Sequence, residues 1–201
     1  MLFRSLGPFR LAIPGLHNVS NALAAIAIGL ELEIPVDLIR KGLNAFSGVE
    51  RRFELRGERA GVTIMDDYGH HPTEIRATLS AVKQGWNRRV VVLFQPHRYT
   101  RTRDLLDDFA HAFDLADVLF VTEIYPAGEE EIPGVSGERL ASTVRDAGHP
   151  DVTWVARKQD LAAQVRPVLR PGDFVITLGA GDIWKAGKEL LELLDQAPPQ
   201  A

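Results

Sequence analysis

Hydrophobic and polar positions follow two patterns along the 201-residue chain. From about residue 61 onward, short apolar runs rich in Val, Ile and Phe alternate with stretches whose apolar residues recur every three or four positions. The first kind is typical of buried strands and the second of amphipathic helices. Five strand–helix pairs follow one another: GVTIMDDY with PTEIRATLSAVKQGW, RVVVLFQP with TRDLLDDFAHAF, ADVLFVTEIY with GERLASTVRDAG, VTWVA with KQDLAAQVRPVLR, and DFVITLGAG with DIWKAGKELLELLDQ. This alternation predicts an α/β domain built on a mostly parallel open sheet with flanking helices.

Residues 1–55 lack this alternation. They offer one possible strand, FRLAIP, and two helices, NVSNALAAIAIGLEL and PVDLIRKGLNAF, the second opened by Pro35. Three elements do not close a domain, so we expect residues 1–55 to be the tail of another domain whose beginning is missing, and residues 56–201 to form the next domain. Because the apolar helix NALAAIAIGLEL is normally covered, we expect the isolated chain to aggregate or dimerise through that face.

Composition narrows the class of protein. The chain has no cysteine, which excludes disulfides, thiolate metal sites and a cysteine nucleophile. Its formal charge of −4 provides no basic field for nucleic acid. No apolar stretch reaches the roughly 18 residues of a membrane span, and no secretory leader is apparent at the N-terminus. We therefore expect a cytoplasmic protein that binds neither nucleic acid nor membrane.

Polar residues gather where the first predicted strand ends. Ligands of open parallel sheets bind outside the carboxyl ends of the strands. The exit DDYGHHPTE holds Asp67, Tyr68 and His70 among three carboxylates, a phenol and two imidazoles. The alternative without a functional role is a capped helix with exposed polar residues. Adjacent histidines point in different directions and have no third ligand at a suitable spacing, so a zinc site is not predicted.

The second strand exit, FQPHRYTRTRD, places arginines at the start of a helix. The helix dipole disfavours cations there, which makes a bound anion the natural explanation. If the helix begins near Tyr99, Arg98 and Arg101 share a face and can hold a carboxylate or phosphate bidentately. The alternative is pairing with Asp104, Asp107 or Asp108, and it fits Arg103 best.

The last strand exit, LGAGDIWKAGKE, only partly matches a phosphate loop or a dinucleotide fingerprint. Its glycine spacing fails both, and Lys188 is followed by Glu. We therefore expect a tight glycine turn and disfavour a dinucleotide oxidoreductase. Two further clusters remain: GLHNVSNALAA, with His17, Asn18 and Asn21, and the pair Arg51–Arg52 in ERRFE. Helix capping could explain the first, and a surface position the second.

Taken in order, GLHNVSNALAA, ERRFE, DDYGHHPTEI, FQPHRYTRT and LGAGDI strongly resemble the Mur ligase family of peptidoglycan synthesis. The similarity runs from about Gly15 to the C-terminal helix, and FQPHRYTRT points to the alanine-adding member. The resemblance implies three domains: one for the UDP-sugar, a central ATPase domain with the phosphate loop, and a Rossmann-like C-terminal domain. It implies that residues 1–55 are the end of the central domain, that the N-terminal part and most of the central domain are missing, and that this chain alone is inactive.

The same resemblance assigns roles. It implies that ATP, with Mg²⁺, phosphorylates the lactyl carboxylate of UDP-N-acetylmuramate, and that the amine of L-alanine attacks the acyl phosphate. Direct metal ligands are not assigned. The matched residues form three groups: His17, Asn18, Asn21 and Asp67 at ATP and the metal region, Arg52 and His70 at the reacting centre, and Tyr68, His97, Arg98 and Arg101 around the alanine.

Alternatives from the same residues stay open. One is a wall-recycling member of the family that joins a tripeptide instead of alanine. The other is a free-standing module that binds a nucleotide or amino acid without catalysis. For the ligase, closure of one domain over the other would exclude water from the acyl phosphate, and we predict that Arg51–Glu58 includes the hinge.

Overall fold

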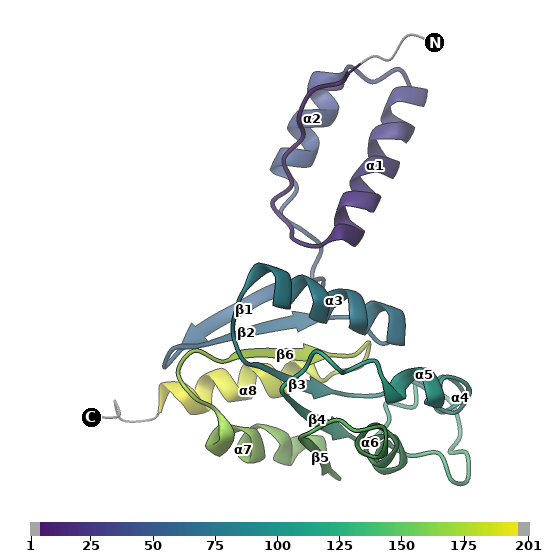
Figure 1. Cartoon of the computed structure of the whole chain (residues 1–201), viewed down its shortest axis with the longest axis vertical. Helices are drawn as coiled ribbons and strands as arrows, with labels where there is room; N and C mark the ends of the chain where they lie inside the picture. The colour runs from purple at the N-terminus through teal and green to yellow at the C-terminus, as the bar shows by residue number, and fades with distance from the viewer. Residues whose placement is uncertain (1–4, 197–201) are drawn as a thin grey trace. The chain divides into compact units, whose positions relative to one another are not determined.

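The computed structural model describes residues 5–196 and divides the chain into two compact units between Glu50 and Arg51 (Figure 1). The smaller unit contains helices α1 (Leu16–Glu31) and α2 (Val36–Ala45). Both helices were predicted. The two pack where Gly29 of α1 lies so close to Ile39 of α2 that an added Cβ would come within 2.7 Å of its side chain.

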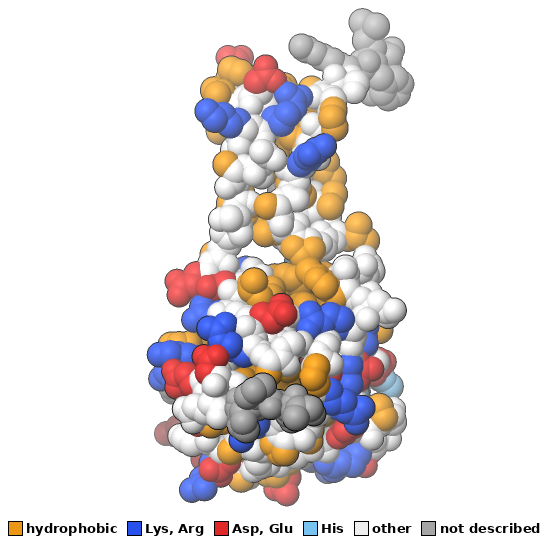
Figure 2. Space-filling view, turned by 90° about the vertical axis from the view of Figure 1, so that its left-hand side faces the viewer, with side chains coloured by type: hydrophobic (Ala, Val, Ile, Leu, Met, Phe, Trp, Pro, Cys, Tyr) orange, Lys and Arg blue, Asp and Glu red, His pale blue; other side chains and the backbone are white. Residues whose placement is uncertain are grey.

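The possible strand FRLAIP is irregular, which corrects that prediction. No described residue before Arg51 forms a strand that could pair with it, and an unpaired strand leaves its backbone groups unsatisfied. Arg40 instead fixes this segment, donating hydrogen bonds to the carbonyl oxygens of Leu6 (2.7 Å) and Pro8 (3.3 Å). Figure 2 shows apolar side chains at the surface of this unit, and Leu16 and Leu23 of α1 are 73% and 62% exposed.

The larger unit is built on a six-stranded sheet of order β1-β2-β6-β3-β4-β5. Its strands are β1 (Glu54–Arg59), β2 (Val62–Asp67), β3 (Val90–Phe94), β4 (Val118–Thr122), β5 (Val152–Val155) and β6 (Phe174–Leu178). All neighbouring pairs are parallel except β1–β2. The mostly parallel α/β sheet and its five predicted strands are confirmed. The edge strand β1 was not predicted, because ELRGER lacks an apolar run.

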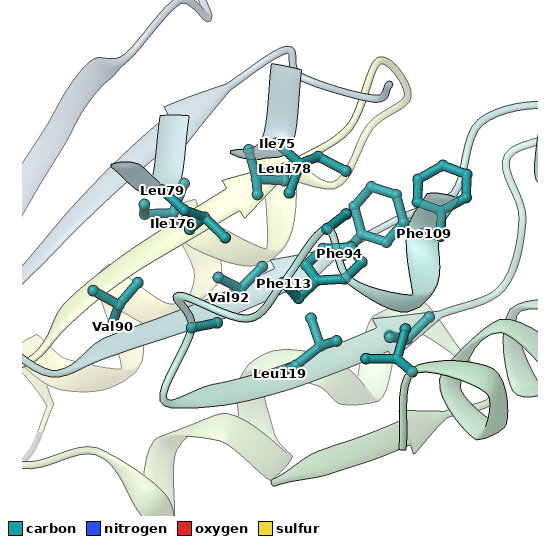
Figure 3. Close-up of a cluster of buried hydrophobic side chains, with 14 of the residues drawn as sticks. Ile75, Leu79, Val90, Val92, Phe94, Phe109, Phe113, Leu119, Ile176 and Leu178 are labelled. Atoms are coloured by element: carbon teal, nitrogen blue, oxygen red, sulfur yellow. The ribbon is translucent and has the colours of Figure 1, made fainter. Parts of the chain in front are cut away.

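Helices cover both faces of the sheet. Helix α3 (Pro72–Gly85), α5 (Leu106–Ala110) and α6 (Gly137–Asp146) pack on one face, and α7 (Leu161–Val165) and α8 (Trp184–Asp195) on the other. Successive side chains of β3 alternate between the faces, so Val92 and Phe94 join the first core and Leu93 the second. Figure 3 shows the first core, where Phe94 meets Phe109 and Phe113 at ring-centroid distances of 5.7 and 5.0 Å.

Two predicted helices are interrupted. The stretch after β3 forms α4 (Tyr99–Asp104) and then α5, with a break at Leu105, after which Phe109 and Phe113 are both buried against the sheet. The stretch 158–170 forms a 3-10 turn (Lys158–Asp160), the short helix α7 and a second 3-10 turn (Arg166–Val168). Pro167 explains where α7 ends, because proline supplies no N–H to continue the helix.

Candidate functional site

The carboxyl ends of three neighbouring strands meet at one edge of the sheet. Leu178, at the end of β6, pairs with Asp67 of β2 on one side and with Phe94 of β3 on the other. The loops that follow these strands therefore begin side by side, as expected for a parallel sheet. Most of the site residues predicted from the larger unit lie in these loops or at the strand ends.

Asp67 ends β2 and is buried, with 6% of its surface exposed. One carboxylate oxygen accepts a hydrogen bond from the N–H of Gly69 (2.7 Å) and the other from the N–H of Phe53 (2.9 Å). Burial raises the pKa of Asp67, while these two backbone hydrogen bonds act in the opposite direction. Its carboxylate thus ties the segment before β1 to the loop after β2.

The loop after β2 turns into α3 through a capping box. The His71 ring accepts a hydrogen bond from the N–H of Thr73, and Glu74 accepts bonds from the N–H groups of His70 and His71. This arrangement agrees with the capped-helix alternative for His71 and Glu74. His70 is different, because its Nδ1 donates to the carbonyl oxygen of Tyr68 (2.9 Å). That bond leaves Nε2 as the lone-pair nitrogen of a neutral ring.

Arg98 and Arg101, two of the three arginines after β3, do not pair with the aspartates that follow them. Arg101 donates from one guanidinium nitrogen to Nδ1 of His97 (3.1 Å) and to the His97 carbonyl oxygen (3.3 Å). Arg98 lies 3.7 Å from Glu129 and is half exposed. Arg103 does bind Asp104 (2.7 Å), so the pairing alternative is confirmed for Arg103 alone. Two arginines are therefore left at the start of α4 without an aspartate.

His97 connects the two loops, since its ring lies 5.5 Å from that of His70 between centroids. Burial, followed by the neighbouring His70, Arg101 and Arg98, lowers the pKa of His97 to about 4. At neutral pH the ring is therefore uncharged, and its Nδ1 can accept the hydrogen bond from Arg101. A protonated His97 ring would be repelled by the positive charges of Arg101 and Arg98.

Arg51 is part of the site framework, and reasoning from the sequence missed it. Its guanidinium binds Asp66 (2.9 Å) and the carbonyl oxygens of Gly179 (2.7 Å) and Gly181 (2.9 Å). The surface interpretation of the arginine pair is thus wrong for Arg51. Its neighbour Arg52 is half exposed, 3.6 Å from Glu74, and its guanidinium lies over the Tyr68 ring. The only sequence signal was the pair itself, which does not distinguish the two arginines.

The segment after β4 was also missed. The ring of Tyr125 stacks on His97 at an interplanar angle of 9°, and Glu129 accepts hydrogen bonds from Thr100. Gly181 lies against Tyr125, because a Cβ there would come within 2.7 Å of the ring. This contact explains the glycine turn predicted after β6.

His17, Asn18 and Asn21 form a separate cluster in the smaller unit. Gly15 is the N-cap of α1 and no side chain caps the helix, so the capping interpretation is wrong for these residues. Asn18 donates to the carbonyl oxygen of Pro14 (2.6 Å) and accepts a long hydrogen bond from Asn21 (3.5 Å). His17 and Asn21 are exposed.

The larger unit matches a known family model. The model described as "Mur ligase, glutamate ligase domain" covers residues 51–181. The chain belongs to the Mur ligase family. The family resemblance of the sequence motifs is thereby confirmed, and the strand-end loops described above lie almost entirely within the matched residues.

Individual members of the Mur ligase family resemble the chain over nearly its full length. The UDP-N-acetylmuramate–L-alanine ligase of Myxococcus xanthus is 56% identical over 194 residues, which are 96% of this chain and 41% of that protein. The enzyme of the same name from Geobacter sulfurreducens is 52% identical over 193 residues, 96% and 42% of the two chains. The chain thus spans about two fifths of the length of these relatives.

Solved structures of Mur ligases agree. The UDP-N-acetylmuramate–alanine ligase of Thermotoga maritima has a TM-score of 0.77 at 30% identity, over 94% of this chain and 40% of that one. A murein peptide ligase from Psychrobacter arcticus has a TM-score of 0.71 at 25% identity, over 94% and 39%. Both support the α/β fold with its parallel sheet.

Two kinds of feature are absent from residues 5–196 of this Mur ligase chain. No group of three or more His, Asp or Glu side chains could hold a metal ion. None of the described helices is both long and apolar enough to cross a membrane. Direct metal ligands therefore stay unassigned.

Proposed function

We propose that this chain is the C-terminal part of an ATP-dependent ligase that joins L-alanine to UDP-N-acetylmuramate in peptidoglycan synthesis. Residues 1–55 would be the end of the central ATP-binding domain and residues 56–201 the C-terminal domain. The observation that carries the proposal is the pair Arg98 and Arg101 beside neutral His97 at the carboxyl edge of the sheet. Identity of 52–57% to ligases of that name supports it.

The reaction would proceed in two steps. An oxygen of the lactyl carboxylate attacks the γ-phosphorus of ATP, which forms an acyl phosphate and releases ADP. The amine of L-alanine then attacks the acyl carbon, inorganic phosphate leaves, and the nitrogen loses a proton. Because the acceptor is an anion that must present its amine, two arginines that orient its carboxylate supply much of the rate enhancement.

The residues of the larger unit have proposed roles in the second step. Arg98 and Arg101 hold the alanine carboxylate, and Tyr68 and His97 line the same pocket. His70 lies next to His97, and its Nδ1–H is already committed to the Tyr68 carbonyl oxygen. Its Nε2 is therefore the nitrogen suited to take the proton from the attacking amine.

The ATP side of the proposal rests on resemblance. Arg52, half exposed and bound only weakly to Glu74, is free to reach a phosphate. His17, Asn18 and Asn21 are proposed to contact ATP and the metal region. Asp67 is proposed to lie near the ribose, although Phe53 and Gly69 already use both of its oxygens. Mg²⁺ would neutralise phosphate charge.

The test joins this chain to the N-terminal domain and the preceding part of the central domain of the Myxococcus xanthus relative, and follows phosphate release. Reactions contain ATP, Mg²⁺ and UDP-N-acetylmuramate, with and without L-alanine. We expect alanine-dependent release that falls by at least about a hundredfold in Arg101→Ala, since that change removes one arm of the carboxylate clamp. Arg103→Ala is the matched control, because Arg103 is exposed and binds Asp104.

The two candidate functions differ in the acceptor that is joined to UDP-N-acetylmuramate, L-alanine or a tripeptide. The likeness to a murein peptide ligase at TM-score 0.71 favours a tripeptide ligase of wall recycling as the alternative. Release that ignores L-alanine and responds to the tripeptide L-alanyl-γ-D-glutamyl-diaminopimelate would establish that enzyme. A well-folded joined protein with no release under either condition would favour a binding module without catalysis.

A further inference from the structure

The loop after β4 contacts the carboxylate clamp formed by Arg98 and Arg101, although it belongs to a different part of the chain. Five of its residues, Tyr125–Glu129, which we name the bracing segment, lie more than twenty residues beyond Arg101 in the sequence. Nothing in their composition marks them as part of a site. They nonetheless contact three residues in or beside the clamp: His97, Arg98 and Thr100.

Tyr125 fixes the first of these parts through both backbone and ring. Its N–H donates to the carbonyl oxygen of Pro96 (2.8 Å), and its own carbonyl oxygen accepts from the N–H of Arg98 (2.9 Å). These bonds form a short parallel bridge across His97. The Tyr125 ring then stacks on the imidazole, with 5.6 Å between centroids. His97 is thereby held between Tyr125 and His70.

Glu129 fixes the start of α4. Its carboxylate accepts hydrogen bonds from the N–H of Thr100 (3.0 Å) and from the Thr100 hydroxyl (2.6 Å), and it lies 3.7 Å from the Arg98 guanidinium. These interactions with Thr100 lower the pKa of Glu129. The carboxylate thus satisfies an N–H at the first turn of the helix and is favourably placed there.

The clamp needs such support for two reasons. Arg98 combines a φ of 72° with a ψ of 138°, a positive-φ backbone conformation that non-glycine residues rarely adopt and that persists only where the surroundings hold it. Helix α4 has six residues, too few to be stable alone. The bracing segment contacts both weak points.

We propose that Tyr125 and Glu129 are positioning residues for the carboxylate clamp: they hold His97 and the start of α4 so that Arg98 and Arg101 converge on one anion. This inference rests on the proposed ligase function, in which that anion is the carboxylate of L-alanine. Neither residue touches the reacting atoms. They affect the reaction only by fixing the positions of the two arginines.

The test measures kcat and KM for L-alanine and for ATP in the joined full-length enzyme. Glu129→Ala and Tyr125→Ala each raise KM for L-alanine about tenfold, with kcat and KM for ATP changed less than about twofold, because ground-state positioning of the acceptor is lost. Tyr125→Phe keeps the stacking ring and behaves as wild type. Glu129→Gln keeps a hydrogen-bond acceptor for Thr100, and its KM for L-alanine lies between those of the wild type and Glu129→Ala. Glu130→Ala, an exposed neighbour, is the control.

A second measurement is independent of turnover. In the 201-residue chain, Glu129→Ala accelerates amide hydrogen exchange at Thr100 and leaves exchange in β3 unchanged, whereas Glu130→Ala affects neither. An unchanged KM for L-alanine in a folded Glu129→Ala enzyme, or unchanged exchange at Thr100, would overturn the inference while the ligase function stands. A wild-type joined enzyme that ignores L-alanine would overturn the ligase function, and with it the role assigned to this segment.

Discussion

At the scale of single residues, the site depends on which groups are charged and which are already bound. His97 accepts a hydrogen bond from Arg101 only while its ring is neutral, and the surrounding burial and positive charges keep it neutral. Asp67 and Arg51 are engaged within the fold, whereas Arg52 and Arg98 are half exposed. These two half-exposed arginines keep donors for a ligand, and Arg101 has only one guanidinium nitrogen engaged.

We predict that His97 titrates with a pKa of about 4, measured from its Cε1–H chemical shift by NMR. An unfolded histidine takes up its proton at about pH 6.5, so His97 lowers the stability of the folded state as pH falls from about 6.5 to 4. Arg101→Gln removes one of the charges that repel a protonated His97 and therefore raises the midpoint of the His97 titration. A wild-type midpoint near 6.5 would contradict this account.

A second prediction separates the two adjacent arginines. Arg51→Ala leaves the fully buried carboxylate of Asp66 without its partner and lowers the free energy of unfolding by about 3–5 kcal/mol. Arg52→Ala, the matched control, costs less than about 1 kcal/mol because its pair with Glu74 is half exposed. Urea unfolding followed by tryptophan fluorescence measures both, since Trp86, Trp154 and Trp184 all lie in the larger unit. Equal losses in the free energy of unfolding of the two variants would refute the different roles assigned to Arg51 and Arg52.

At the scale of elements, the decisive features are where strands and helices end and how closely they pack. Strand β1 pairs with β2 from Glu54 onward, and Arg51 is tied to Asp66 and to the turn after β6. The whole of the predicted hinge Arg51–Glu58 therefore belongs to the larger unit. We now expect motion between the units in residues 46–50, where Gly48 has a φ of 110°.

Helix α6 supplies a packing prediction at this scale. A Cβ on Gly137 would overlap the carbonyl oxygen of Thr122 at the end of β4 and come within 2.6 Å of the Trp154 ring. Gly137→Ala therefore destabilises the larger unit by about 1–3 kcal/mol. Gly85→Ala at the end of α3 has open space and is neutral or stabilising by up to about 1 kcal/mol. Thermal unfolding of the two variants checks the contrast, and a stable Gly137→Ala would show that α6 can shift.

At the scale of the whole molecule, the two units differ in how well they cover their apolar side chains. Leu16, Val19, Leu23 and Leu30 share one face of α1 and are 73%, 45%, 62% and 41% exposed. Ala22, Ile26 and Gly29, on the adjoining face of the helix, are buried. The larger unit instead buries a continuous core on each face of its sheet.

We predict that the 201-residue chain associates with itself through this exposed face of α1, because contiguous exposed apolar surface favours association in water. Sedimentation velocity at increasing concentration measures the effect. Leu16→Gln combined with Leu23→Gln reduces it, whereas Leu115→Gln, a 42% exposed leucine of the larger unit, does not. A monomer at every concentration would refute the prediction.

The sequence by itself determined the five parallel strands, most helices and the family, because these depend on local periodicity and on contiguous motifs. It also located the polar clusters at the strand ends. Only the tertiary structure decided that Arg51 binds the turn after β6, 130 positions away in the case of Gly181. The same holds for strand β1 and for the contacts of Tyr125 and Glu129 with the clamp. Such contacts depend on which strand ends become neighbours, and the order of strands in the sheet is set by packing of the whole chain.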